Sequence, residues 1–275
     1  MRRVCAENGV IYYRSDIIPC IHGFSTRIGG VSRLPHTRGL NLGFDRGDTP
    51  KTVLENLGLF ADALGVAAES IISVSQIHSA NVRVVDGNNR GEGFYKEELE
   101  SCDGYVTDSQ DITLGVRTAD CVPILLYVPP VEPFGGAVAA VHAGWRGTAL
   151  GIAREAVLKL CDMGASLNDI RVAIGPSIGS CCYTVKEDFY KSFSEMAGKA
   201  LTDRYVTLVE DNIWVADLKG ANRQILIDSG VFPDNIDVCD KCTCCNNEEF
   251  FSHRFSKGKR GTMLSVIVNT PKKEV

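Results

Sequence analysis

Three residues with metal-binding side chains stand at the ends of apolar stretches. His78 ends the segment "SIISVSQIH", Cys121 lies between two apolar stretches in "GVRTADCVPILLYV", and His142 ends "GAVAAVH". Two imidazoles and a thiolate are three of the four ligands of a tetrahedral zinc ion, and three protein ligands with one open position are typical of catalytic zinc. The sequence therefore predicts a zinc site if these strand ends meet. Because the spacing is long, ordinary strand-end residues without a metal are the alternative.

The same residues also allow covalent catalysis. Cys121 beside His142 as a base fits a cysteine hydrolase or deamidase, with Asp120 or Gln76 orienting the imidazole. A thiolate that binds a metal is not free to attack a substrate. The zinc hypothesis and the nucleophile hypothesis therefore predict opposite reactivity toward alkylating reagents.

The other cysteines are numerous, since the 275 residues include 11 of them. The segment "CDKCTCC" at 239–245 contains the pair Cys239-x-x-Cys242, which has the spacing of a zinc knuckle. Four ligands from this one short loop would have poor tetrahedral geometry, however. Reduced and packed thiols are therefore predicted for this loop and for the adjacent pair Cys181–Cys182.

Arginines in turn and strand-end contexts are candidates for anion binding. Arg27 lies in "STRIGG", Arg117 in "GVRTAD" and Arg146 in "GWRG". A guanidinium beside the N–H groups at the start of a helix binds phosphate or carboxylate, so an anion is predicted near Arg146 and a helix expected from Thr148. Trp145 either stacks on a bound base or belongs to the core, and both interpretations stay open.

Apolar periodicity predicts the elements that must position these residues. Strands are expected at 70–78, 81–86, 111–118, 122–128, 136–142, 170–175, 235–239 and 263–269, and helices at 49–65, 148–161, 185–201 and 217–230. The first two strands are close enough along the chain to form a hairpin. Strands mixed with helices favour the α+β (mixed α/β) class, and a single domain of mixed β-sheets flanked by helices is expected over residues 1–275.

Composition excludes several classes of function. The formal net charge is −5, and "SKGKR" at 256–260 is the one concentrated basic stretch, so a nucleic-acid partner is not expected. No stretch approaches the roughly 20 apolar residues that cross a bilayer, and the start "MRRVCAENGVIYYR" lacks the apolar core of a signal peptide. We expect a cytoplasmic protein with reduced thiols and a small-molecule substrate, whose charged end "PKKEV" at 271–275 frays.

Seven segments together resemble one known family. In chain order they are "STRIGGVS", "LNLGFDRGD", "QIHSANV", "RTADCVPILL", "AVHAGWRGTALGI", "IGPSIGSCCYTV" and "CTCCNNEEFFSHRF". They are similar to the laccase-domain or polyphenol oxidoreductase proteins, now regarded as purine nucleoside phosphorylases. The resemblance implies a single domain of mixed sheets with flanking helices and one zinc per chain on His78, Cys121 and His142. It also implies phosphorolysis of adenosine, inosine, guanosine and methylthioadenosine with phosphate as co-substrate, together with adenosine deamination.

The resemblance further implies roles for residues around the substrate. Arg27, Asn41, Gln76 and Arg146 match positions expected to contact it. In phosphorolysis, zinc and an arginine hold phosphate or polarise the reacting group, and Asp120 or a water protonates the departing purine. The extra cysteines of "CTCCNN" depart from the family pattern, so the resemblance assigns no role to that loop.

The older laccase function is disfavoured by the histidine count. A multicopper oxidase needs more histidines than the 5 of this chain, which also has no His-x-His pair. A two-histidine, one-cysteine set also suits blue copper, but that needs an axial methionine, and Met163, Met196 and Met263 lie in patterns typical of helix or strand cores. Zinc is therefore preferred. A non-catalytic binder of small ligands or peptidoglycan precursors is the remaining alternative.

Overall fold

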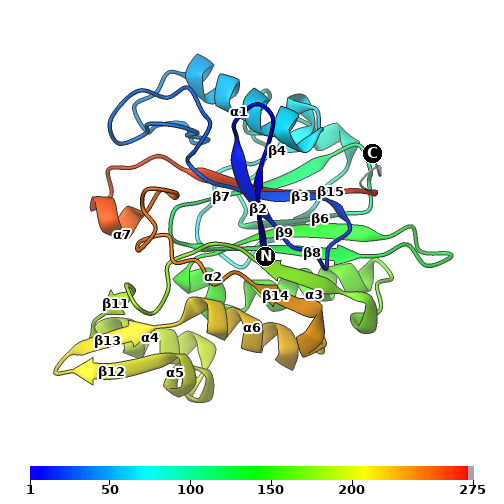
Figure 1. Ribbon diagram of the computed structural model, residues 1–275. Helices are drawn as coiled ribbons and strands as arrows, with labels where there is room; N and C mark the ends of the chain where they lie inside the picture. The colour runs from blue at the N-terminus through cyan, green and yellow to red at the C-terminus, as the bar shows by residue number, and fades with distance from the viewer. Residues whose placement is uncertain (272–275) are drawn as a thin grey trace.

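Two six-stranded sheets pack face to face at the centre of the molecule, and helices cover both outer faces (Figure 1). The computed structural model describes residues 1–271, so residues 272–275 of the end expected to fray lie outside the described part. The described chain contains 7 α-helices and 15 strands in mixed sheets. The predicted α+β class is confirmed.

The first sheet joins both ends of the described chain. Its strands in spatial order are β1 (Arg2–Cys5), β2 (Ile11–Arg14), β3 (Cys20–Ser25), β15 (Met263–Pro271), β7 (Thr113–Thr118) and β4 (Ile71–Ile72). Only β4 runs parallel to its neighbour. Residues 2–25 contain three strands that periodicity did not predict.

The second sheet contains two seven-residue strands that are buried along their whole length. Its order is β14 (Ile236–Val238), β10 (Arg171–Ile174), β8 (Val122–Val128), β9 (Ala137–Ala143), β6 (Gly104–Thr107) and β5 (Val82–Val84). A small third sheet contains β11 (Thr184–Val185), β13 (Ile213–Ala216) and β12 (Val206–Glu210). It projects beside the helices at the lower left of Figure 1.

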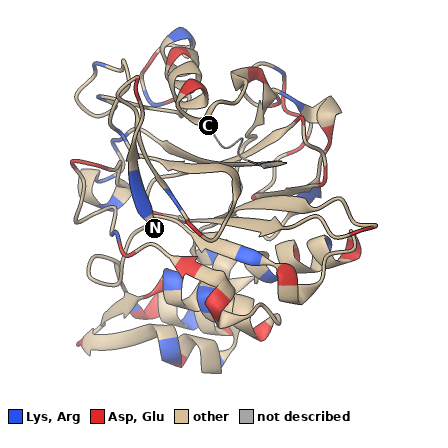
Figure 2. Ribbon diagram, turned by 45° about the vertical axis from the view of Figure 1, so that its right-hand side comes forward, with Lys and Arg blue, Asp and Glu red and all other residues tan. Residues whose placement is uncertain are grey.

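Helices lie outside the sheets. They are α1 (Pro50–Leu64), α2 (Trp145–Ala149), α3 (Ile152–Asp162), α4 (Glu187–Ala197), α5 (Lys199–Tyr205), α6 (Leu218–Asp228) and α7 (His253–Ser256). Short 3-10 turns occur at Ala68–Ser70, Gly87–Asn89, Leu167–Asp169 and Pro233–Asn235. Figure 2 shows charges of both signs interspersed on these helices, as is usual for solvent-facing surfaces. None of the described helices combines the length and the apolar composition needed to cross a membrane.

The buried side chains explain why β8 is apolar throughout. Ile124 and Leu126 pack with the helices that cover the outer face of the second sheet, whereas Leu125 and Tyr127 pack between the two sheets. Successive side chains of a strand point to opposite faces, so a strand buried on both faces is continuously apolar. A third cluster, which includes Phe60 of α1, covers the outer face of the first sheet.

Three sequence expectations about local structure were wrong. The predicted hairpin of 70–78 with 81–86 does not form, because β4 pairs in the first sheet and β5 pairs in the second. The helix expected from Thr148 is two helices, α2 and α3, separated at Gly151, whose φ is 78°. The helix expected at 185–201 ends at Gly198, with φ 85°, before α5 begins.

Candidate active site

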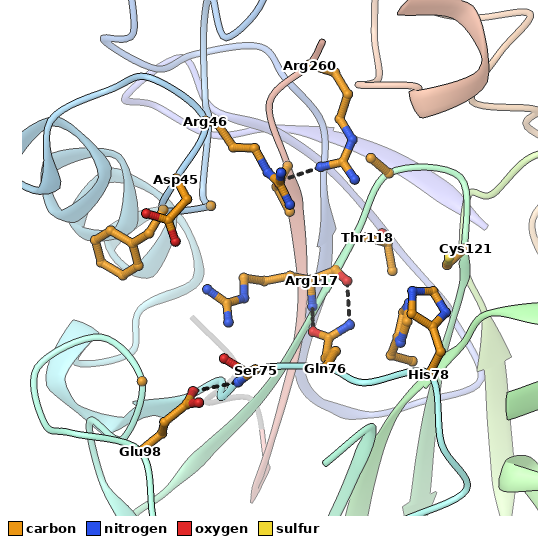
Figure 3. A pocket seen from close by; sticks show the side chains of 16 residues that line it. Asp45, Arg46, Ser75, Gln76, His78, Glu98, Arg117, Thr118, Cys121 and Arg260 are labelled. Atoms are coloured by element: carbon orange, nitrogen blue, oxygen red, sulfur yellow. Dashed lines mark hydrogen bonds between the residues drawn. The ribbon is translucent and has the colours of Figure 1, made fainter. Parts of the chain in front are cut away.

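A cavity of about 390 Å³ opens next to two connections that each run from one large sheet to the other. His78, Cys121 and His142 line one side of it, and Arg46, Arg117 and Arg260 line another (Figure 3). His78 lies in the loop from β4 to β5, and Cys121 lies in the short connection from β7 to β8. Both connections lead from the first sheet to the second, which is why residues far apart in the chain meet here.

The three predicted metal ligands lie together. One donor atom from each of His78, Cys121 and His142 lies within 4.8 Å of the others. The two imidazole rings are 4.9 Å apart between centroids and meet at 74°. His142 is in β9, as expected, but His78 is not at a strand end: β4 stops at Ile72, and His78 adopts a left-handed φ of 59° in the loop.

Asp103 organises this arrangement. It is fully buried immediately before β6, and its Oδ1 lies 2.8 Å from Nδ1 of His142. The ionised carboxylate accepts a hydrogen bond from Nδ1–H of His142, which leaves Nε2 as the nitrogen available to a metal. The same carboxylate accepts N–H bonds from His78 at 3.0 Å and Ser79 at 2.6 Å. One side chain therefore positions two of the three ligands.

The loop conformation around His78 also depends on a glycine. A Cβ on Gly144 would lie 2.3 Å from Nδ1 of His78 and 3.5 Å from Sγ of Cys121. Gly144 has an ordinary φ of −67°, so its missing side chain matters for space and not for backbone conformation. The glycine in "HAGWRG" thus allows the imidazole of His78 to pack against the start of α2.

Asp120 positions Cys121 and does not face the cavity. Its carboxylate accepts hydrogen bonds from the hydroxyls of Thr243 at 2.6 Å and Ser252 at 3.0 Å, and from the backbone N–H of Arg254 at 2.6 Å. Its φ is 92°, a strained value for a residue with a side chain, and these bonds hold it there. Both oxygens are engaged, which argues for a positioning role in place of the proton-donor role expected from the sequence.

The electrostatics favour a cation beside Cys121. Burial lowers the pKa of His142, but the charge of the Cys121 sulfur and the hydrogen bond to Asp103 outweigh it and raise the pKa to about 9. The pKa of His78 is lowered, first by burial and then by the charge of His142. The pocket between Cys121 and the two imidazoles thus stabilises one positive charge, which a metal ion bound there would supply.

Three arginines lie on another side of the cavity, which Asp45 and Glu98 also line. Burial and repulsion from Arg46 lower the pKa of Arg260 to about 10, and Nε of Arg260 is buried without a hydrogen-bond partner. Burial also lowers the pKa of Arg117, whose guanidinium lies 5.7 Å from the centre of the Phe94 ring. An anion bound here would offset the mutual repulsion, so this wall suits a phosphate group.

Of the four residues expected to contact substrate, Gln76 lines this cavity, and so does Arg117, which the sequence marked as a candidate for anion binding. The Gln76 amide forms two hydrogen bonds with the backbone of Arg117, accepting from N–H at 2.7 Å and donating to the carbonyl at 2.8 Å (Figure 3). Gln76 therefore ties the loop that carries His78 to β7. Its amide fixes the wall next to the arginines.

Arg27 and Asn41 lie elsewhere. The Arg27 guanidinium lies 4.5 Å over the ring of Phe251 and donates to the carbonyl of Asn247 at 3.0 Å, next to a separate cavity of about 280 Å³. Asn41 is fully buried, and its amide bonds Asp48 and the backbone of Thr262. Neither Arg27 nor Asn41 lines the cavity of about 390 Å³, so their expected contacts with substrate stay a prediction.

Arg146 and Trp145 lie at the start of α2. Arg146 is exposed, is not among the cavity-lining residues, and stacks on Trp145 with 4.4 Å between the guanidinium carbon and the ring centre. Trp145 packs 5.2 Å from Phe189 at the edge of the core. The core interpretation of Trp145 is favoured over base stacking. The anion expected near Arg146 stays a prediction.

Sequence reasoning missed Asp103, Arg46 and Arg260. Asp103 stands in "SCDGYVT" just before a buried strand, and a metal-bound histidine needs an acceptor for its second nitrogen, so a buried acid of this kind was a possible signal. Arg46 and Arg260 come from loops at opposite ends of the sequence. No local pattern marks them as neighbours.

The donor set fits zinc better than copper oxidation chemistry. Two imidazoles fixed by the fold and one thiolate leave one tetrahedral position for a substrate or water. Within residues 1–271, the side chains grouped closely enough to hold a metal form two sets, and neither contains more than two histidines. A trinuclear copper centre therefore has no ligands in the described chain.

Comparisons with known proteins show the family to which the chain belongs. Residues 21–270 match the family described as "Multi-copper polyphenol oxidoreductase laccase". The chain is 35% identical over 250 residues to "Purine nucleoside phosphorylase YlmD" of Bacillus subtilis, covering 90% of this chain and 87% of that protein. It is 37% identical over 236 residues to "Adenosine deaminase RL5" of an unknown prokaryotic organism, covering 85% of this chain and 88% of that protein.

Two further comparisons define the extent of the similarity. The mouse "Purine nucleoside phosphorylase LACC1" is 34% identical over 262 residues, which cover 92% of this chain but only 57% of the mouse protein. The solved structure of the Bacillus licheniformis hypothetical protein YfiH superposes with a TM-score of 0.84 at 33% identity, covering 94% of this chain and 98% of that one. The arrangement of sheets and helices is thus shared across nearly the whole chain.

Proposed function

This chain belongs to the family described as multi-copper polyphenol oxidoreductase laccase, and on that premise we propose that it is a zinc-dependent purine nucleoside phosphorylase. The proposed substrates are adenosine, inosine, guanosine and methylthioadenosine, with phosphate as co-substrate. Relatives named purine nucleoside phosphorylase and adenosine deaminase support both phosphorolysis and a deaminase side activity. We propose one catalytic zinc per chain, bound by His78, Cys121 and His142, a single domain over residues 1–275 and a cytoplasmic location.

One observation carries this proposal: the His78, Cys121 and His142 donor atoms share a cavity with three arginines. The ligands offer a metal with an open position, and the basic wall offers a site for phosphate. A nucleoside phosphorylase needs both a place for phosphate and a means to stabilise the departing base. The cavity of about 390 Å³ is within the range of sites for small ligands.

We assign metal binding to one side of the cavity and phosphate binding to the side that carries the arginines. Zinc, when bound, supplies Lewis-acid chemistry, either polarising an oxygen or lowering the pKa of a water. Arg260 and Arg117 hold and orient phosphate through charge-assisted hydrogen bonds, with Arg46 at the exposed edge. Gln76 fixes the Arg117 backbone. Because Asp120 is fully engaged elsewhere, the proton for the leaving purine is assigned to a water in the cavity.

A cysteine hydrolase is a second candidate, because Cys121, His142 and Asp103 form the series that a catalytic triad needs. His142 lies between the sulfur and the carboxylate, and its raised pKa of about 9 is compatible with a thiolate–imidazolium pair. The triad assigns no role to His78, however. The 4.9 Å approach of the second imidazole is explained by a metal and not by a nucleophile.

Metal content and product analysis test the proposed function. Purified protein should contain zinc and convert adenosine plus phosphate to adenine and ribose 1-phosphate, with some inosine from deamination. His78→Ala should remove both the metal bound here and the activity, whereas His253→Ala, which alters an exposed histidine at the start of α7, should retain both. Equal release of free base without phosphate would identify a hydrolase and reject the proposed mechanism.

Alkylation at Cys121 separates the two candidates. A zinc-bound thiolate should react slowly with an alkylating reagent and quickly after chelation, whereas a catalytic nucleophile should react quickly before chelation. Peptide mapping must read Cys121 itself, because the chain has 11 cysteines. Rapid modification in zinc-loaded protein, with turnover lost and zinc retained, would support the cysteine hydrolase.

A further inference from the structure

The fold brings four cysteines together outside the cavity. Sγ atoms of Cys181, Cys182, Cys242 and Cys245 all lie within 4.8 Å of one another. The first two lie in the turn after β10, and the other two lie in the loop after β14. The sequence pattern drew attention to Cys239-x-x-Cys242, but the structure selects the next pair in register, Cys242-x-x-Cys245, and completes it with a pair from another loop.

We propose that these four cysteines, called here the four-cysteine cluster, bind a second zinc ion with a structural role. Four thiolates around one zinc are the usual ligand set of a closed structural site. Two loops contribute two ligands each, so the objection that one short loop cannot surround a metal does not apply. The site goes beyond the proposed function, because none of the four residues lines the cavity of about 390 Å³.

The sulfur spacing fits one metal ion. A Zn–S bond of about 2.3 Å gives a tetrahedron whose sulfurs are about 3.8 Å apart. Here Sγ of Cys245 lies 3.5 Å from Sγ of Cys181 and 3.3 Å from Sγ of Cys182. An iron–sulfur cluster places several metal ions and bridging sulfides between its thiolates, which requires wider spacing. The four-cysteine cluster is compact enough for a mononuclear site.

The surrounding backbone is shaped to hold these sulfurs. The N–H of Gly179 donates to Sγ of Cys242 at 3.2 Å, a bond that stabilises a thiolate. A Cβ on Gly179 would lie 3.2 Å from Sγ of Cys181, so glycine leaves the space that the sulfur occupies. The Arg254 guanidinium donates to the carbonyl of Cys182 at 3.2 Å and places positive charge beside the anionic ligand set.

The same loops brace the connection that carries Cys121. The N–H of Ile178 donates to the carbonyl of Asp120 at 2.9 Å, and the N–H of Thr243 donates to the carbonyl of Ser177 at 3.0 Å. Thr243 follows Cys242 directly and bonds the Asp120 carboxylate through its hydroxyl. A zinc ion that joins the two loops would therefore rigidify the hydrogen-bond network that holds Asp120, and through it the backbone of Cys121.

Metal counting on the full-length protein tests the second site. Protein purified under reducing conditions should contain about two zinc ions per chain, Cys245→Ser about one, and Cys5→Ser, which alters an exposed cysteine outside the cluster, about two. Cys244→Ser is the control within the loop, since Cys244 is not in the cluster. Loss of the second metal in Cys244→Ser, or an unchanged count in Cys245→Ser, would overturn the assignment.

Cobalt substitution keeps this test separate from the proposed function. Cobalt(II) loaded into His78→Ala should retain the strong thiolate-to-metal absorption of a four-sulfur tetrahedral site, and Cys245→Ser should lose it. If the cavity binds no metal, His78→Ala leaves the zinc count unchanged while Cys245→Ser still lowers it. The two proposed metal sites can therefore be rejected separately. A disulfide between Cys245 and Cys181 or Cys182, found by peptide mapping of protein purified under reducing conditions, would reject a metal site.

Discussion

The Asp103 carboxylate and the His142 imidazole lie 2.8 Å apart, and the same carboxylate accepts backbone bonds from the loop that carries His78. Asp103 is fully buried and does not line the cavity of about 390 Å³. Its hydrogen bonds with His142 and Ser79 hold its pKa below the usual range despite burial, so it stays ionised near neutral pH. The geometry of two metal ligands thus depends on one residue that is not itself a ligand.

Asp103→Asn is expected to weaken zinc binding by about 10- to 100-fold, because the amide keeps the shape but removes the charge that orients His142. Competition with a chelating dye measures the affinity directly. Glu92→Gln is the matched control, since Glu92 is also buried but pairs with Arg83 and forms no hydrogen bond with a metal ligand. Equal metal affinity in Asp103→Asn and the native protein would show that the histidine needs no such partner.

Gly144→Ala tests the space beside His78. The added methyl would lie 2.3 Å from Nδ1 of His78, so the imidazole must move and zinc affinity should fall with little change in folding. Gly58→Ala in α1 is the control: its Cβ would meet nothing within 4 Å, and it should stabilise the helix by about 0.5–1 kcal/mol. Thermal unfolding and zinc titration of both variants separate the two effects. Unchanged zinc affinity in Gly144→Ala would mean that the loop is free to adjust.

Arg260→Gln tests the proposed phosphate wall. Loss of one charge-assisted hydrogen bond costs about 1.5–3 kcal/mol, so the KM for phosphate should rise about 10- to 100-fold while zinc stays bound. Arg33→Gln changes an exposed arginine outside the cavity and should leave the phosphate dependence unchanged. Initial rates at saturating nucleoside and varied phosphate give the comparison. A rise in the KM for nucleoside alone would move Arg260 to the nucleoside side of the cavity.

Local sequence signals predicted some elements well. Thr49 caps α1 through its side chain, and Gly65 ends it with a left-handed φ of 74°, as the pattern at 49–65 indicated. These signals act between residues a few positions apart, so the sequence displays them directly. The split of the helix expected at 185–201 also follows a local residue, Gly198, whose positive φ the periodicity does not reveal.

Pairing between distant strands could not be predicted in the same way. Strand β15 lies between β3 and β7, although β3 comes from the start of the chain. The β4 and β5 strands are neighbours in sequence but belong to different sheets. Partner choice depends on packing across the whole domain, which is why the predicted hairpin was wrong.

The residues of the candidate site likewise include some that the sequence indicated and some that only the fold brings together. His78, Cys121 and His142 could be named because their residue types limit the chemistry and a family resemblance joined them. Of the basic wall, the sequence marked only Arg117 as a candidate, since Arg46 and Arg260 meet only after both loops are placed on the fold. Asp120 was a candidate proton donor because of its residue type. Only the structure shows that its carboxylate oxygens accept hydrogen bonds from Thr243 and from the backbone of Arg254.

The buried His22 gives a pH prediction that is independent of the metal ligands. It lies in β3, where Nε2 accepts from the N–H of Ser15 at 2.9 Å and Nδ1 lies 2.9 Å from the carbonyl of Cys20. Burial lowers the pKa of His22 to about 4, against an ordinary value of 6.5. Protonation also removes the acceptor that Ser15 uses. The folded protein therefore favours the neutral imidazole of His22.

Since the unfolded chain binds this proton more tightly, stability from neutral His22 is present above about pH 6.5 and is lost as the pH falls toward 4. The full loss is about 3 kcal/mol in the free energy of unfolding. His22→Gln retains a donor and an acceptor but does not titrate, so its deficit relative to the native protein should shrink as the pH falls through this window. Carboxylates and metal ligands titrate in both proteins, and the difference between their urea unfolding curves isolates His22. A deficit that stays constant from about pH 7 to about pH 4 would show that the imidazole is not held neutral by the fold.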